Sequence, residues 1–186
     1  MDTTNTWLIL YSSITGNTKS IAEAIYKEAP EGSAIKDIKE WDTFSGDLDS
    51  YAVVACGYWL KLGGPDPLMS RRLPAIKNKK VVFFETHGAL VGSEHAVTAF
   101  ARAACLLGEN CEVVGTYSCQ GRINPVLLAK RENTGEDDPH GPSEENKRRW
   151  QMAAEHPNAE DFADAAAFTR AMQKKIVRMA KYRQAK

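Results

Sequence analysis

The sequence predicts an α/β fold: a doubly wound, five-stranded parallel sheet with helices on both faces. Over the first two-thirds of the chain, short apolar runs alternate with segments of helical period, which favours right-handed β-α-β units. The first run is apolar at nearly every position, as in a strand that is covered on both faces. A chain of 186 residues is long enough for one such domain, and we expect it to span residues 1–186.

The expected elements follow in chain order. The strands are rich in aliphatic and aromatic residues and cover residues 6–11, 33–38, 51–57, 80–85 and 111–117. The helices carry an apolar stripe; the first begins near Asn17 and ends before Pro30, and the others cover residues 94–107, 125–131 and 159–182. Residues 132–146 are rich in Gly, Pro, Asp and Glu without a hydrophobic period, so we expect a solvated loop. This predicts a core of residues 1–122, followed over residues 123–186 by a loop and a C-terminal helical extension that packs on it.

Composition excludes several classes of protein. Lys plus Arg and Asp plus Glu both total 24, and this zero net charge argues against a nucleic-acid binder, which would be basic. No stretch approaches the ~20 apolar residues of a membrane span, so none is expected. The first residues lack the basic start and apolar run of a signal peptide, and the four cysteines form no C-x-x-C pair. We therefore expect a reduced, cytoplasmic setting.

The segment after the first expected strand has the composition of a phosphate-binding loop. Four hydroxyl side chains surround one glycine there: Ser12, Ser13, Thr15 and Thr18. Gly16 lets the backbone approach an anion, and the helix expected from Asn17 points its unpaired N–H groups into the same concavity. A Walker A loop is excluded because Asn17 stands in place of its lysine, and a G-x-G-x-x-G fingerprint is absent. The remaining alternative is an ordinary polar turn.

The segment Tyr11-Ser12-Ser13-Ile14-Thr15-Gly16-Asn17-Thr18 resembles the FMN-phosphate signature Ser/Thr-x-Thr-Gly-x-Thr of flavodoxins. Further segments resemble one flavodoxin-like subfamily of single-domain bacterial proteins: residues 57–59, 63–66, 86–89, 93–96, 119–122 and 156–158. The resemblance spans nearly the whole chain. It implies FMN as the cofactor and the strand order 2-1-3-4-5, with the ligand at the carboxyl edge of the sheet.

Three loops would then surround the flavin ring. Tyr58, Trp59 and Leu60 follow the expected end of the third strand, and one of the two aromatic side chains would stack on the ring. The pattern does not decide which one, and the alternative is that an aromatic residue covers the sheet edge. The loop after the fourth strand would contact the polar edge of the ring through Thr86, His87, Gly88 and Ala89. Gln120 would line the same rim, and a purely structural role for His87 stays open.

Flavodoxins generally reorient one peptide in the loop after the third strand to hydrogen-bond the reduced ring. The resemblance implies the same device here, although residues 60–65 depart from an ordinary flavodoxin. Which peptide would move is therefore left open.

The resemblance implies an electron-transfer protein that shuttles electrons between soluble redox partner proteins, because the flavin supplies the chemistry. We expect no catalytic side chain and no metal ligand. The alternatives are an FMN-dependent NAD(P)H oxidoreductase acting on a small acceptor, or a dedicated redox subunit of one reductase. In the second alternative, the loop of residues 132–146 or the basic end of the last helix would dock the reductase. A scaffold without flavin is a further alternative. The neutral charge departs from typical flavodoxins, which are strongly acidic.

Overall fold

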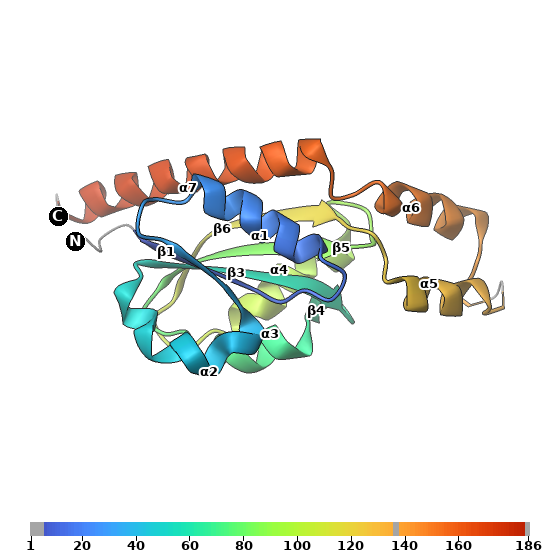
Figure 1. Ribbon diagram of the computed structural model, residues 1–186, viewed down its shortest axis with the longest axis horizontal. Helices are drawn as coiled ribbons and strands as arrows, with labels where there is room; N and C mark the ends of the chain where they lie inside the picture. The colour runs from blue at the N-terminus through green and yellow to red at the C-terminus, as the bar shows by residue number, and fades with distance from the viewer. Residues whose placement is uncertain (1–5, 136–137, 185–186) are drawn as a thin grey trace.

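Five parallel strands form the centre of the computed structural model, which describes residues 6–135 and 138–184. They are β1 (Trp7–Tyr11), β2 (Ala34–Asp37), β3 (Val53–Lys61), β5 (Lys80–His87) and β6 (Glu112–Gln120). The order β2-β1-β3-β5-β6 confirms the expected doubly wound sheet (Figure 1). A two-residue strand that was not expected, β4 (Gly64–Pro65), pairs with the end of β3 in the antiparallel sense.

Two long helices cover one face of the sheet (Figure 1): α1 (Asn17–Glu28) and α7 (Ala159–Gln184). Their apolar stripes bury Ile21, Ile25 and Ile176 against Ile9 and Phe84 of the sheet. All five residues of β1 are buried, as the continuous apolar run predicted. Helix α7 thus packs on this face of the sheet.

Shorter elements cover the opposite face. They are η2 (Ile38–Glu40), α2 (Trp41–Phe44), η3 (Ser45–Ser50), α3 (Pro67–Arg72), η4 (Leu73–Ala75) and α4 (Glu94–Cys105). Trp41, Phe44, Met69 and Leu73 are buried beneath these elements. Apart from α4, these elements were not expected from the sequence, because segments of three to six residues are too short to show a helical period.

Strand β3 is longer than expected. The prediction ended it at Gly57, but it continues to Lys61 and returns through a tight turn into β4. Leu62 and Gly63 form that turn, both with positive φ (52° and 73°). The guanidinium of Arg102 on α4 donates a hydrogen bond to the Leu62 carbonyl oxygen at 2.9 Å, which ties the turn to the helix.

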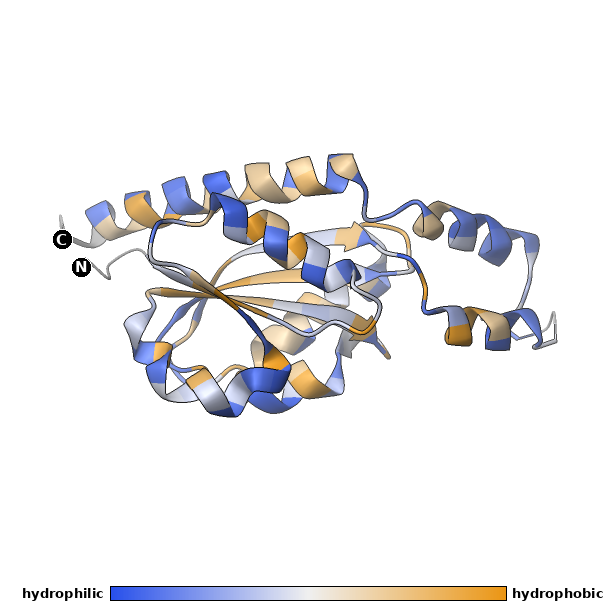
Figure 2. Ribbon diagram, viewed as in Figure 1, coloured by the Kyte–Doolittle hydropathy of each residue, from blue (hydrophilic) through white to orange (hydrophobic). Residues whose placement is uncertain are grey.

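Between β6 and α7 the chain forms two helices, α5 (Pro125–Glu132) and α6 (Glu144–Ala154), here called the helical hairpin. It projects beyond the carboxyl ends of the strands (Figure 1); α6 is mostly hydrophilic, whereas α5 also carries hydrophobic residues (Figure 2). Ile123, Trp150 and Ala153 are its buried apolar residues. The expected loop over residues 132–146 is thus wrong at its end, because α6 begins at Glu144. The start of α6 was missed because the few apolar residues of this helix show little helical period. Residues 136–137 lie outside the described part.

Candidate functional site

Backbone hydrogen bonds join the end of β1 to β3, and the end of β5 to the segment that follows β6. The Ser12 amide donates to the Gly57 carbonyl at 2.8 Å, and the Gly121 amide donates to the His87 carbonyl at 2.9 Å. β1 lies between β2 and β3, so the crossovers leave it in opposite directions and the switch point of the sheet lies here. The sheet therefore brings the predicted phosphate loop and the predicted ring-binding segments to one edge.

The phosphate loop presents an open backbone at the start of α1. Gly16 has φ of 91°, a left-handed conformation that side chains disfavour, and no atom lies within 4 Å of where a Cβ would stand. No side chain caps the helix, so its first N–H groups lack a side-chain partner. The Ser13 hydroxyl oxygen accepts from the Gly16 amide at 3.1 Å, and Thr15 is exposed. These neutral donors fit a phosphate monoester.

Two of the four hydroxyl groups are used inside the protein instead. The Ser12 hydroxyl donates to Asp66 Oδ1 at 2.9 Å, and the hydroxyls of Thr18 and Thr86 lie 2.8 Å apart as a buried hydrogen-bonded pair. Ser12 and Thr18 therefore hold the shape of the loop. The side chains of Ser13 and Thr15 remain nearer to solvent.

Asp66 lies beneath this loop and is the N-cap residue of α3. Its Oδ1 accepts from the amides of Leu68 and Met69 at 2.9 and 3.3 Å. Burial raises the pKa of the Asp66 carboxyl, while its hydrogen bonds, the one from Ser12 first, oppose that rise. The carboxyl thus links the phosphate loop to the segment that follows β4.

The two aromatic candidates lie on opposite faces of β3, because side chains alternate along a strand. Tyr58 is fully buried, with its ring 6.1 Å from that of Phe83 and 6.4 Å from that of Phe100. Leu60 packs on the same face as Tyr58. Trp59 is half-buried and lies on the face that α1 covers. The alternation could not be applied while the strand was expected to end at Gly57.

The loop after β5 uses its polar side chains internally. The buried His87 ring contacts the Ala89 carbonyl through Nδ1 at 3.1 Å and the Ser118 hydroxyl through Nε2 at 2.7 Å. Gln120 donates to the same Ala89 carbonyl at 2.9 Å. The Ile123 side chain packs on Gly88, where an added Cβ would lie 2.6 Å from Ile123 Cγ1. The space beside Gly88 is thus filled by the protein's own side chain.

Asn17 connects the phosphate loop to the helical hairpin. Its side-chain amide donates to the Arg122 carbonyl at 2.8 Å, and the Arg122 amide donates to the His156 carbonyl at 2.9 Å. The Arg122 guanidinium donates in turn to the Ala154 carbonyl at the end of α6. The side-chain amide of Asn17 is therefore used in a link between loops.

Glu85 is a buried acid at this edge that the sequence analysis did not single out. Its side chain is 0% exposed, and Oε1 lies 3.4 Å from the Ser118 hydroxyl. Burial raises the pKa of the Glu85 carboxyl to about 8, and burial lowers the pKa of His87 to about 4. A charged residue that ends the apolar run of residues 81–84 was the available signal.

Neither a metal-binding cluster nor a membrane-spanning helix occurs within residues 6–135 and 138–184. No three His, Cys, Asp or Glu side chains among them gather as a metal site would require. None of their helices combines the length and apolar character that a membrane crossing needs.

Known proteins similar to this chain share one domain type. A family model described as a flavodoxin domain matches residues 8–170. The flavodoxin-like domain-containing protein BilS of Clostridioides difficile (strain CD3) is 32% identical over 168 residues, covering 89% of this chain and 94% of that protein. BilS of Clostridium symbiosum (strain WAL-14163) is 23% identical over 171 residues, covering 84% and 90%. Oxidised flavodoxin 2 from Bacillus cereus has a similar fold, with a TM-score of 0.57 at 20% identity over 91% of this chain and 99% of that one.

Proposed function

The chain belongs to the flavodoxin domain family, and from this premise we propose that it binds one FMN non-covalently and carries electrons between soluble redox partner proteins. The observation that carries the proposal is the loop of residues 12–18. It combines an open glycine, exposed hydroxyl groups and an uncapped helix start at the switch point of the sheet. Bound FMN would supply the transfer of one or two electrons.

Each part of the cofactor has a matching set of residues in this proposal. Ser13, Thr15, the Gly16 backbone and the first turn of α1 would hold the phosphate. Trp59 would stack on the ring, because it is the half-buried aromatic residue on the α1 face of β3. The backbone at residues 88–89 would meet the polar edge of the ring. The hydrogen bonds of His87 and Gln120 to the Ala89 carbonyl would hold this backbone in place.

FMN titration of the purified apoprotein tests the cofactor. The double variant Thr15→Ala, Gly16→Val removes a hydroxyl and places a β-branched side chain at positive φ, and we expect FMN affinity to fall at least tenfold. The matched control Thr43→Ala, Gly46→Val changes the same residue types on an exposed segment with open space around Gly46. Its FMN affinity should equal that of the unmodified protein. Equal binding by both double variants would contradict the proposed phosphate site.

Reaction with nicotinamides separates the carrier from the alternative oxidoreductase. The chain lacks the G-x-G-x-x-G fingerprint, which favours the carrier. We expect the FMN-loaded protein to leave NADH and NADPH unconsumed in the presence of a small quinone acceptor. Steady consumption of either nicotinamide would favour the oxidoreductase instead.

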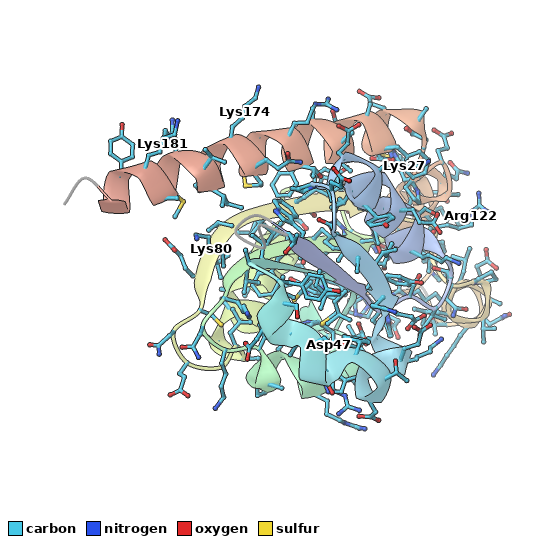
Figure 3. The ribbon with its side chains drawn as sticks, turned by 60° about the vertical axis from the view of Figure 1, so that its left-hand side comes forward. Lys27, Asp47, Lys80, Arg122, Lys174 and Lys181 are labelled. Atoms are coloured by element: carbon cyan, nitrogen blue, oxygen red, sulfur yellow. The ribbon has the colours of Figure 1, made fainter. Side chains whose placement is uncertain are left out.

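The helical hairpin favours a dedicated reductase as the partner. It lies beside the site at the carboxyl edge (Figure 1), and Val126 is 80% exposed on it. The basic end of α7 lies at the opposite edge, since Lys175 bonds the Val114 carbonyl near the start of β6. Lys174 and Lys181 there point away from the sheet (Figure 3). The docking elements considered were the loop of residues 132–146 and the basic end of the last helix. The hairpin that contains this loop is the element near the proposed flavin site.

Exposed substitutions on the two elements test this docking. We expect Val126→Ser, on α5, to slow turnover with the partner reductase several-fold while FMN affinity stays unchanged. Val177→Ser on α7, where the side chain is 43% exposed, is the control and should leave turnover unchanged. Slower turnover of the control alone would assign docking to α7.

A further inference from the structure

A polar chain runs beneath the loop of residues 86–89, on the face of the sheet that α4 covers. Glu85 on β5 is paired in register with Ser118 on β6, and His87 lies two residues further along the same face. The Ser118 hydroxyl lies 3.4 Å from Glu85 Oε1 and 2.7 Å from His87 Nε2. Glu85 and His87 themselves are 3.9 Å apart. Ser118 therefore bridges two buried titratable groups.

The Ala89 carbonyl restricts where the protons of the Glu85–Ser118–His87 chain can be. A carbonyl oxygen only accepts, so His87 Nδ1 must carry a proton and donate it at 3.1 Å. If the ring is neutral, Nε2 accepts from Ser118, and Ser118 in turn accepts from a protonated Glu85. If the ring is charged, Nε2 donates to Ser118, and Ser118 donates to an ionised Glu85. These two patterns differ only by the shift of one proton along the chain.

The surroundings favour the neutral pattern when the site carries no added charge. Glu85 is 0% exposed, and among the described residues no lysine or arginine forms an ion pair with it. Burial raises the pKa of Glu85 to about 8 and lowers that of His87 to about 4, so both groups favour their neutral forms at pH 7. The other titratable groups nearby are Tyr58 and Cys56 from β3, Cys119 from β6 and His95 from α4.

One neighbour of Glu85 keeps an open hydrogen-bonding position. The Tyr58 hydroxyl is buried without a hydrogen-bond partner, and so is Glu85 Oε2. Tyr58 lies close enough for Glu85 to contribute to the raised pKa of its hydroxyl, after desolvation as the main cause. After burial, which raises the pKa of the Glu85 carboxyl, hydrogen bonding by Tyr58 to the ionised form acts in the opposite direction, so Tyr58 is placed to donate to Glu85 once the carboxyl is ionised. The pattern with an ionised Glu85 thus has Tyr58 as a further hydrogen-bond donor.

We propose that the Glu85–Ser118–His87 chain is a proton shuttle that compensates negative charge on the flavin, an inference that rests on the proposed binding of FMN. When an external reductant adds negative charge beside residues 86–89, the Glu85 O–H bond breaks and its proton passes to the Ser118 oxygen. The original Ser118 proton passes to His87 Nε2. The chain keeps its net charge, while a positive imidazolium replaces a neutral ring next to the Ala89 carbonyl. Glu85 and Ser118 are positioning residues that act through His87.

Nitrogen-15 NMR of histidine-labelled, FMN-loaded protein at pH 7 tests the shuttle directly. We expect a neutral His87 ring with its proton on Nδ1 in the oxidised protein and a doubly protonated ring after reduction with dithionite. In Glu85→Gln the ring should stay neutral in both states, because the amide has no acidic proton to give. Glu109→Gln, at an exposed position, is the matched control and should behave like the unmodified protein.

Affinity for the two redox states provides a second readout. Coupling between two sites typically changes the affinity of one of them between fivefold and 150-fold. We therefore expect the affinity for reduced FMN to fall about tenfold in Glu85→Gln, with affinity for oxidised FMN nearly unchanged. Ser118→Ala should have the same effect while leaving both titratable groups in place, so it covers the case in which Glu85→Gln does not fold.

The outcomes separate this inference from the proposed function. A His87 ring that stays neutral after reduction, in a protein that binds FMN normally, would overturn the shuttle and leave the carrier proposal intact. Protonation of His87 in Ser118→Ala would overturn it as well, because the proton would then come from solvent. Protein that stays colourless with excess FMN would overturn both, and the missing flavin spectrum identifies that case.

Discussion

The parallel sheet and the helical hairpin meet at the candidate site, but they are stabilised very differently. The sheet has an apolar cluster on each face, with Ile9, Phe83 and Phe84 fully buried. Among the described residues, the apolar cluster of the hairpin holds Trp150, Ala153 and Ile123, which lies just before α5. The hairpin is joined to the site through Ile123 on Gly88 and through the Asn17 amide. The comparison teaches that the sheet sets the geometry of the phosphate loop, whereas the hairpin depends on that loop for its position.

Removing a large side chain from the sheet should have the greatest effect on stability. Phe84→Ala empties a fully buried site at the centre of one cluster, and such truncations typically cost about 3–5 kcal/mol of unfolding free energy. Urea unfolding followed by circular dichroism measures it. We expect one cooperative transition at a much lower urea concentration. A loss below about 1 kcal/mol would mean that the sheet core adapts easily, contrary to the dense packing of protein interiors.

The sheet should also show a specific pH dependence that the hairpin does not share. The raised pKa of Glu85, from 4.5 to about 8, stabilises the folded state at low pH, and this contribution declines as the pH rises from 4.5 to 8. The lowered pKa of His87, from 6.5 to about 4, stabilises above pH 6.5, and this contribution declines as the pH falls from 6.5 to 4. Between pH 4.5 and 6.5 the two groups therefore change the unfolding free energy with pH in opposite directions.

Of these two groups, only Glu85 still makes the unfolding free energy depend on pH above pH 6.5. We therefore expect the unfolding free energy to fall by about 2 kcal/mol between pH 6.5 and 8, since one pKa unit corresponds to about 1.36 kcal/mol. Urea unfolding of the apoprotein at these two pH values checks it. Glu85→Gln should remove the slope and Glu109→Gln should keep it. A slope that survives in Glu85→Gln would assign the pH dependence to other groups.

A core substitution in the hairpin should have the smallest effect on global stability. Trp150→Ala removes the largest buried side chain of α6, so we expect amide hydrogen exchange over residues 125–154 to become about tenfold faster. The unfolding free energy of the whole protein should fall by about the same amount, about 1.4 kcal/mol for a factor of ten, which is well below the loss expected for Phe84→Ala. Met152→Ala, at a 42% exposed position on the same helix, is the control. A large global loss from Trp150→Ala would show that hairpin and sheet unfold together.

The sequence predicted the sheet well and the details of the site less well. Strands with continuous apolar runs, such as residues 80–85, were placed within a few residues of their observed ends. Strand β3 was cut short because Gly57 reads as a turn residue, and this error hid the alternation that separates Tyr58 from Trp59. Helix α6 was missed because its surface is polar and its few buried residues show little period. Local composition carried little information in both places.

By itself, the sequence determined the alternation of strands and helices and the hydroxyl-rich loop around Gly16, because periodicity and short-range backbone chemistry suffice for both. The tertiary structure alone decided how those side chains are used: Ser12 on Asp66, Thr18 on Thr86, and Glu85 joined to His87 through Ser118. Each of these contacts joins residues that lie 31 to 68 positions apart in the chain. Hydrogen bonds of that kind depend on strand order and register, which a local pattern does not encode.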